Sequence, residues 1–87
     1  MSDYSFSDHS LKEIERRNLS LEMVKRTIER PDQRIIVREG RIVVQSRVQL
    51  SSRDYLLRVI LDIDRVPAVV VTAYVTSKIG KYWRHST

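Results

Sequence analysis

The chain has 87 residues, a length that fits one folded domain and not two. Its 16 lysines and arginines against 11 acids give a net charge of +5, which suggests a basic surface. The absence of cysteine argues against a disulfide-stapled secreted domain and favours the reducing cytoplasm. No apolar run approaches the roughly 18 residues of a membrane-spanning helix. We therefore expect a single cytoplasmic domain over residues 1–87, with no membrane segment.

The excess positive charge lies in the middle of the chain and in its tail. Residues 8–30 carry six bases and five acids, so this part is nearly balanced. Residues 32–54 carry five bases and three acids, and residues 76–87 carry three bases and no acid. A basic surface of this kind suggests a nucleic acid or an acidic protein as partner. A surface whose charge serves only solubility is the alternative.

The segment that follows Phe6 predicts a first short helix. Ser7 is placed to cap it, and Phe6 and Leu11 occupy the two positions that pack against each other across a capped helix start. Leu11 and Ile14 begin an apolar side. His9 falls on roughly the opposite side at 100° per residue, so we expect it outside the core. A histidine at a helix start with no special task is the alternative to a catalytic role for His9.

A second helix is predicted between Ser20, its cap, and Pro31, which stops it. Its apolar positions share one helical face: Leu21, Val24 and Ile28. After Pro31 the apolar period changes to two, which predicts strands at residues 34–39, 41–50, 55–63 and 68–75. Gly40 is placed to form a tight turn between the first two of these strands.

These elements predict an α+β domain in which two N-terminal helices pack on one face of a four-stranded antiparallel sheet. Ser77 is placed to cap one short C-terminal helical turn that holds Ile79, Tyr82 and Trp83. Alternation assigns to the helix-covered face Ile42, Val44, Val48, Leu57, Val59, Val69 and Val71. It assigns to the opposite face Arg34, Ile36, Arg38, Gln45, Arg47, Leu56, Arg58, Ile60, Val70, Thr72 and Tyr74.

The face opposite the helices has the composition of an RNA-binding surface. Arginines neutralise phosphates, and flat rings stack on unpaired bases. The tail adds cationic and aromatic residues near its edge: Lys78, Lys81, Tyr82, Trp83 and Arg84. A second interpretation is that Tyr82 and Trp83 fold back and cover the apolar part of this face, with Tyr74 at the edge of the core.

The same face has groups suited to RNA cleavage. Attack of a 2′-hydroxyl on its phosphodiester needs a base, an acid and cations for the charge that grows on the phosphate. Arg47, Arg58 and Lys78 can supply that positive charge. Candidates for proton transfer are His9, Tyr74, Tyr82 and His85. The sequence has no Gly-rich phosphate loop and no cluster of ligands at metal spacing, so we expect neither a metal nor a cofactor.

Two stretches carry a resemblance to a known family. The opening "SDHSLKEIERRNLSLEMVKRTIERPD" resembles small bacterial domains of unknown function in the RelE/ParE toxin superfamily. The end, "LLRVILDID" with "VVVTAYVTSK", resembles the last strands of the same family and is similar to BrnT-type toxins. Asn18 stands where the family pattern has Gly, and Asn tolerates the left-handed backbone that a glycine allows.

The resemblance implies a RelE-like fold and a toxin-like endoribonuclease of a type II toxin–antitoxin system. Such a protein cleaves mRNA without a metal, often at the ribosome, and is neutralised by a cognate antitoxin protein. The positions that match the family are His9, Arg17, Thr72, Tyr74, Lys78 and Tyr82.

Combining resemblance and pattern, we assign as catalytic candidates His9, Tyr74, Lys78 and Tyr82. We assign as RNA-binding candidates Arg17, Arg47, Arg58, Thr72, Lys81 and Arg84. Two alternatives stay open: a non-catalytic interaction module, including a homodimer built on the apolar strands, and an RNA-binding module that does not cleave.

Overall fold

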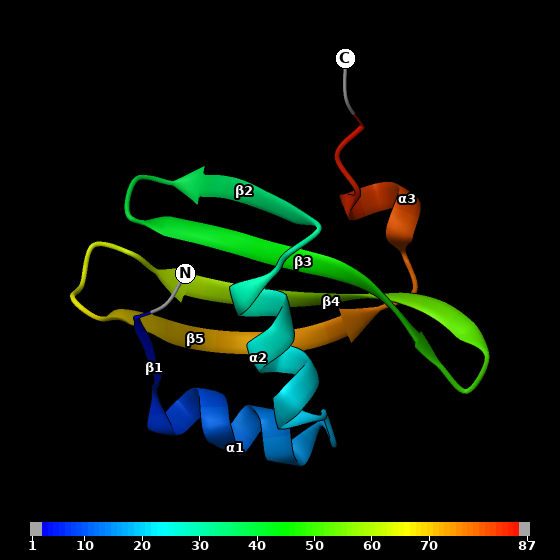
Figure 1. Ribbon diagram of the computed structural model, residues 1–87, viewed down its shortest axis with the longest axis horizontal. Helices are drawn as coiled ribbons and strands as arrows, with labels where there is room; N and C mark the ends of the chain where they lie inside the picture. Colours follow the sequence, from blue (N-terminus) through cyan, green and yellow to red (C-terminus); the bar gives the residue numbers. More distant parts are fainter. Residues whose placement is uncertain (1–2, 86–87) are drawn as a thin grey trace.

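A five-stranded sheet forms the centre of the computed structural model, which describes residues 3–85 (Figure 1). The strand order is β1-β5-β4-β3-β2, and every neighbouring pair is antiparallel except β1 and β5, which are parallel. The elements in chain order are β1 (Tyr4–Phe6), α1 (Asp8–Arg16), α2 (Leu21–Glu29), β2 (Gln33–Arg38), β3 (Arg41–Leu50), β4 (Arg53–Asp62), β5 (Ala68–Thr76) and α3 (Ile79–Tyr82).

The predicted four-stranded, all-antiparallel sheet is therefore wrong. The protein is α+β with a mixed sheet, because Tyr4–Phe6 adds a strand parallel to the start of β5. Three residues are too few to show an alternation, and the partner strand begins more than sixty positions later, with Tyr4 opposite Ala68. The sequence prediction assigned Phe6 to the helix start, whereas the structure places it at the end of β1.

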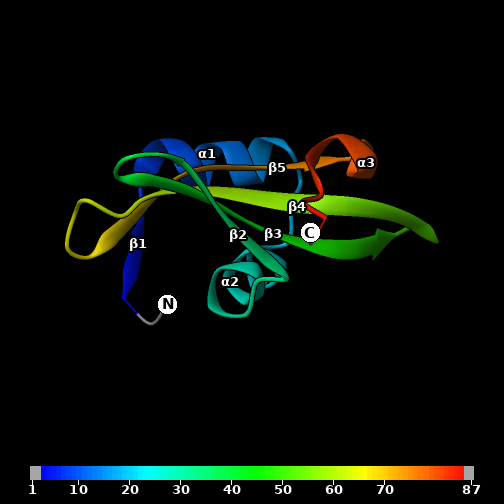
Figure 2. The ribbon, with the colours of Figure 1, turned by 90° about the horizontal axis from the view of Figure 1, so that it is seen from above.

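The two N-terminal helices occupy different places instead of forming one layer on one face. α1 lies alongside β5 at the edge of the sheet, whereas α2 lies over β3 and β4 (Figure 1). The predicted serine caps are confirmed, since Ser7 Oγ accepts from Ser10 N at 3.0 Å and Ser20 Oγ accepts from Met23 N at 3.2 Å. Seen from above, α2 and α3 lie on opposite sides of the sheet (Figure 2).

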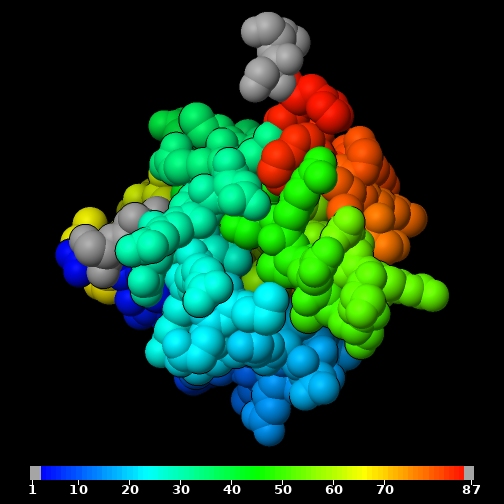
Figure 3. Space-filling view, turned by 45° about the vertical axis from the view of Figure 1, so that its right-hand side comes forward, coloured from blue at the N-terminus to red at the C-terminus, as the bar shows by residue number. Residues whose placement is uncertain are grey.

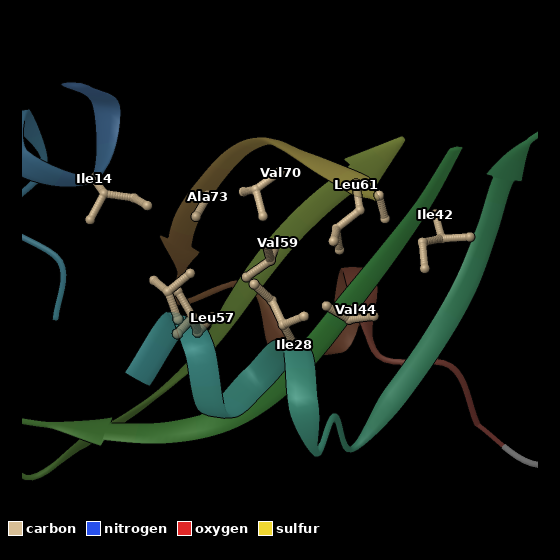
Figure 4. Packing of buried hydrophobic residues seen from close by; sticks show 11 residues of the cluster. Ile14, Ile28, Ile42, Val44, Leu57, Val59, Leu61, Val70 and Ala73 are labelled. Carbon is tan, nitrogen blue, oxygen red and sulfur yellow. The ribbon is translucent and has the colours of Figure 1, made fainter. Parts of the chain in front are cut away.

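The hydrophobic core lies between the helices and one face of the sheet (Figure 4). Its buried members are Ile14, Val24, Ile28, Ile42, Val44, Leu57, Val59, Leu61, Ala68, Val70 and Ala73. Burial of such side chains contributes roughly 1.5–3 kcal/mol for each large one, so this layer is the main source of stability. Leu11, predicted on the apolar side of the first helix, is 42% exposed.

A register shift in β5 overturns part of the predicted face assignment. Ile60 pairs with Thr72, whereas Leu61 pairs with Val70, so Val71 is an extra residue in the ladder. Val70 is consequently in the core and Val69, opposite Asp62, is on the other face, which reverses the prediction for both. Thr72 follows the shift and stays on the face opposite the core, as predicted.

Strand β2 shows a second error of the same kind. Arg34 lies opposite Val44 and Ile36 opposite Ile42, so both are on the core side of the sheet and not on the other face. A register shift follows, after which Arg38 lies opposite Arg41. The prediction started this strand at Arg34 and missed Gln33, which is the first residue of β2.

Three turns use the left-handed backbone, at Asn18, at Gly40 and at Ser51–Ser52 between β3 and β4. Gly40 has φ 81° in the β2–β3 turn, and a Cβ there would lie 2.9 Å from Asp64 Oδ2, so both the backbone and the space favour glycine. Asn18 has φ 54° just after α1, which confirms that asparagine adopts the left-handed conformation here. Between residues 3 and 85, no helix has both the length and the apolar character to cross a membrane.

Candidate functional site

A row of four polar side chains crosses the sheet on the face opposite the core. Gln33, Gln45, Arg58 and Tyr74 oppose one another in register across β2, β3, β4 and β5. Gln45 Nε2 donates to Gln33 Oε1 at 2.8 Å, and Arg58 Nε donates to Gln45 Oε1 at 2.9 Å. Arg58 Nη1 donates to Tyr74 Oη. We call these four residues the polar row.

The chain after β5 folds over the polar row. The carbonyl oxygen of Tyr82 accepts from Gln45 Nε2 at 3.1 Å. Gln33 binds the backbone of Arg84 twice, because its Oε1 accepts from Arg84 N at 3.0 Å and its Nε2 donates to Arg84 O. Figure 3 shows the C-terminal segment in red between the β2 side of the molecule and α3 in orange. The two glutamines therefore fix the position of this segment.

Two aromatic rings of this segment lie against arginines of the sheet. Arg58 Cζ is 4.1 Å from the ring centroid of Tyr82, and Arg47 Cζ is 4.4 Å from that of Trp83. Stacking of a guanidinium on a ring is favourable by about 0.5–2 kcal/mol, depending on how well solvent is excluded. We call the polar row together with Arg47, Tyr82 and Trp83 the Arg58 cluster.

The face that sequence analysis left bare is covered at its centre. Gln45 and Leu56 are fully buried and Val43 is 4% exposed, although all three point away from the main core. The interpretation in which Tyr82 and Trp83 fold back over this face is the one the structure supports. The arginines and tyrosines do gather on one side of the sheet, but under a segment that partly shields them.

The Arg58 guanidinium is held in a fixed orientation and keeps donors to spare. An arginine has five N–H groups, and Nε and Nη1 make the hydrogen bonds to Gln45 and Tyr74. Tyr74 Oη accepts from Arg58, so its own proton is free to be donated elsewhere. A half-buried, oriented guanidinium beside a phenol is suited to binding an oxyanion and passing a proton to it.

Exposed cations lie in the cluster and around it: Arg47 within it, and Lys78, Lys81 and Arg84 beside it. None of them forms an ion pair with a carboxylate side chain among residues 3–85, where the ion pairs involve Glu13 and Asp62 as the acids. Lys81 Nζ lies 5.2 Å from the ring centroid of Tyr82, and the amide of Lys78 donates to Thr76 Oγ1 at 3.1 Å. These side chains are available to an anionic partner.

Two predicted RNA-binding residues instead join α1 to the edge of the sheet. Arg17 Nη1 donates to the carbonyl oxygen of Ala73 at 2.7 Å and to Thr72 Oγ1 at 3.2 Å. β1 pairs only with residues 68–70 of β5, so this carbonyl lies on an edge that β1 does not cover. The contact satisfies a backbone acceptor and places Arg17 at the edge of β5, where Thr72 lies two residues before Tyr74 on the same face.

His9 is not brought to the cluster either. Its side chain is 70% exposed on the first turn of α1, and its nearest charged partner is Glu13, 3.7 Å from Nε2. The start of α1 lies beside Val70, whose carbonyl accepts from Ser7 N at 3.3 Å, whereas Tyr74 and α3 lie toward the other end of β5. The other catalytic candidates, Tyr74, Tyr82 and Lys78, lie at or next to the cluster.

The groups whose pKa values are shifted lie outside the Arg58 cluster and take part in structural contacts. A hydrogen bond from Arg16 lowers the pKa of Glu13, and one from Arg41 lowers the pKa of Asp62. Burial, with the hydrogen bond to Glu29 second, raises the pKa of Tyr4 to about 12. The phenol of Tyr4 donates to Glu29 Oε2 at 2.8 Å and so ties β1 to α2.

Gln33 is the member of the cluster that sequence reasoning missed. It lies just after the Pro31-Asp32 turn, where the alternation is too short to locate the start of a strand. Its role depends on the C-terminal segment returning to it across 51 positions of sequence. No local signal in the sequence indicates such a contact.

A comparison with protein-family models found no match, and comparisons with curated proteins and with solved structures found none either. Within residues 3–85, no three His, Cys, Asp or Glu side chains gather closely enough to hold a metal ion.

Proposed function

We propose that this protein is a toxin-like endoribonuclease that binds single-stranded mRNA at the Arg58 cluster and cleaves it without a metal. The observation that carries the proposal is the Arg58 guanidinium, oriented by Gln45, bonded to Tyr74 and stacked on Tyr82. The resemblance of the chain to small domains of the RelE/ParE toxin superfamily supports it as an independent line of argument.

RNA binding follows from charge and flat rings placed together. Arg47, Lys78, Lys81 and Arg84 offer positive charge to the phosphates. Tyr82 and Trp83 offer ring faces at the same place, and base–aromatic stacking contributes about 1–3 kcal/mol per base. Single-stranded RNA is preferred because its bases are free to leave their own stack.

Cleavage would proceed by attack of the ribose 2′-oxygen on the adjacent phosphorus. A bond forms between these atoms, the bond from phosphorus to the 5′-oxygen breaks, and the products carry a 2′,3′-cyclic phosphate and a 5′-hydroxyl. Arg58 neutralises the charge that grows on the phosphate, and Tyr74 donates its proton to the departing 5′-oxygen. The proton of the 2′-hydroxyl is lost to water or to a nearby base.

The proposed partners follow from the same resemblance. We place the protein in the cytoplasm, acting on mRNA at the ribosome, and held inactive by a cognate antitoxin protein. Expression of the chain alone should then arrest growth, and co-expression of the antitoxin should relieve the arrest. A gene for a small acidic protein beside the gene for this chain is the expected source of that antitoxin.

The direct test is cleavage of a fluorescent single-stranded RNA by the purified protein in EDTA. We expect products ending in 2′,3′-cyclic phosphate, and no cleavage of an RNA whose 2′-hydroxyl is replaced by hydrogen at the cut site. Tyr74→Phe should lower the rate by about 100-fold, the scale of a single general acid, while RNA affinity stays unchanged.

Arg53→Ala is the matched control for the loss of a cation, because Arg53 is exposed at the far end of β4 and takes no part in the cluster. Arg58→Lys should lower both affinity and rate, since an ammonium cannot make the same pair of hydrogen bonds. Cleavage that survives unchanged in Tyr74→Phe and Arg58→Lys would contradict the site.

RNA binding without cleavage is the second candidate, and one observation favours it. The C-terminal segment covers Gln45, and Arg58 is already engaged by Gln45, Tyr74 and Tyr82. In that case the RNA would bind to the rings and to the exposed cations, and its affinity would fall steeply as the salt concentration rises. No cleavage product would form.

A further inference from the structure

The outer edge of β2 is unpaired within the described part of the chain. β2 is the last strand of the sheet, and the one strand of residues 3–85 that pairs with it is β3. Among residues 3–85, its residues 33–38 make no backbone–backbone hydrogen bond on the outer side. A strand of this length presents a row of free N–H and C=O groups that can pair with another extended chain.

This edge is also apolar and exposed. Ile36 is 70% exposed and Val37 is 56% exposed, the largest exposures of apolar side chains in the strands of the described chain. A hydrogen bond of 2.9 Å from Ile63 N to Gly40 O holds the β4–β5 loop beside the β2–β3 turn. That loop adds Ile63, 36% exposed, and Val66, 99% exposed, at the same end of the sheet. Grouped exposed side chains of this size mark an interaction site more often than scattered ones do.

The positive charges of β2 favour a partner strand with acidic residues. β2 reads Gln-Arg-Ile-Ile-Val-Arg, with Arg34 and Arg38 flanking the apolar centre and no acid in between. Neither arginine forms an ion pair with a carboxylate side chain of residues 3–85, whereas Asp62, at the same end, is held by Arg41 at 2.7 Å. An acidic residue directly across from each arginine would stabilise an added strand by about 0.2–1 kcal/mol per pair.

We propose that the outer edge of β2 binds an extended segment of another protein, with apolar residues at its centre and acidic residues at both ends. The segment adds to the sheet as a strand beside β2, and its backbone groups pair with those of residues 33–38. Its central side chains cover Ile36 and Val37. This proposal does not depend on the RNA proposal, since the polar row contributes side chains and the outer edge of β2 contributes backbone groups, with Gln33 as the one residue in both.

A second copy of the chain fits this edge poorly. Two β2 strands paired about a two-fold axis would bring Arg34 and Arg38 of both copies into one short ladder. Like charges along such a ladder are destabilising, and each copy already carries a net charge of +5. The charge pattern therefore favours an acidic partner.

The test uses the full chain, labelled with ¹⁵N, and a capped peptide of about seven residues with valines at the centre and glutamates at both ends, matched to the length of β2. On binding, the amides of β2 that do not bond to β3 should shift and exchange more slowly with water. A peptide of the same sequence, N-methylated at every second residue, keeps the charge and loses one edge of backbone donors. It should bind about tenfold more weakly or not at all.

Variants distinguish binding at the edge of β2 from a nonspecific attraction between the acidic peptide and the basic protein. Arg34→Glu with Arg38→Glu should weaken peptide binding about tenfold, whereas Lys12→Glu with Arg53→Glu, which makes the same change in net charge at exposed positions away from β2, should weaken it far less. Ile36→Lys should also weaken it. No peptide binding, equal binding of the N-methylated peptide, equal losses in the Arg34/Arg38 and Lys12/Arg53 variants, or a stable dimer that hides β2 would each overturn the proposal.

Discussion

The two faces of the sheet are built from different chemistry. The face under α2 is an apolar core, to which Ile14 of α1 also contributes and in which the buried side chains are aliphatic. The face under α3 buries Gln45 among hydrogen bonds to Gln33, Arg58 and the backbone of Tyr82. The burial of aliphatic side chains on folding is enough to account for the composition of the first face.

The second face is costly to build, because every buried polar group must find a partner. Among residues 3–85, no buried side-chain nitrogen or oxygen lacks one. In this network every buried polar group has a hydrogen-bond partner, and Arg58 is half-buried and held in one orientation. Burying these polar groups costs desolvation free energy, and an apolar layer would stabilise the fold without that cost. This contrast is the physical basis for placing the functional site on the second face.

The largest effect should come from truncating a leucine on the core face. Leu61 and Leu56 are both fully buried on β4 but point to opposite faces. Leu61→Ala should lower the free energy of unfolding by about 3 kcal/mol, because the packed core closes only partly around the cavity. Leu56→Ala should cost about 2 kcal/mol, because the C-terminal segment can settle into the space. Denaturant unfolding measures both, and equal losses would remove the contrast between the faces.

The next effect concerns the polar row. Gln45→Leu keeps the volume but leaves Arg58 Nε and the carbonyl oxygen of Tyr82 without their partner, and should cost about 2 kcal/mol. It should also loosen the C-terminal segment, so that acrylamide quenches the fluorescence of Trp83 more strongly. Gln49→Leu, at an exposed position of the same strand, is the control. A variant as stable as the parent, with Trp83 equally shielded, would show that the row does not hold the segment.

A smaller effect is expected where α1 meets the sheet. Arg17→Met removes the donor to the carbonyl of Ala73 and should cost about 1 kcal/mol. Arg16→Met, which removes a surface partner of Glu13, should cost less than half as much. If Arg17→Met also weakens RNA binding while the fold stays intact, Arg17 belongs to the site and the assignment to the edge is wrong.

The smallest effect appears only in alkali. The folded state raises the pKa of Tyr4 from 10.0 to about 12, so its contribution to stability is complete below pH 10 and is lost as the pH rises toward 12. Tyr4→Phe should abolish that part of the alkaline decline in unfolding free energy. Glu29→Gln should make the decline smaller and make it end at lower pH, because without the neighbouring negative charge the pKa of Tyr4 in the folded state is less raised. Parallel curves for the parent and Tyr4→Phe between these pH values would contradict the assignment.

The sequence was most informative where a regular period runs for many residues. The alternation in residues 41–50 predicted β3 with the bounds the structure has. The same rule failed in β5 and β2, because one inserted residue in each ladder reverses the faces on one side of it. It had no signal for β1, whose three residues become a strand only through β5.

The sequence predicted several residues of the site but not the contacts that join them. Arg47, Arg58 and Tyr74 were placed on one face by alternation, and the register confirms that placement. The burial of Gln45, the part played by Gln33 and the return of Trp83 onto Arg47 depend on contacts between distant segments. His9 was selected as a proton-transfer group outside the core and by resemblance, and Arg17 by resemblance; neither argument carries information on where α1 lies relative to α3.

The central claim is that single-stranded RNA binds at the Arg58 cluster, and a titration of the ¹⁵N-labelled protein with a short oligoribonucleotide tests it most directly. We expect the largest shifts at the indole N–H of Trp83, the side-chain amides of Gln45 and Gln33 and the Nε–H of Arg58, with the shifts weakening as salt rises. Shifts confined to α2 or to the edge of β2, or no shifts at low salt, would contradict the claim.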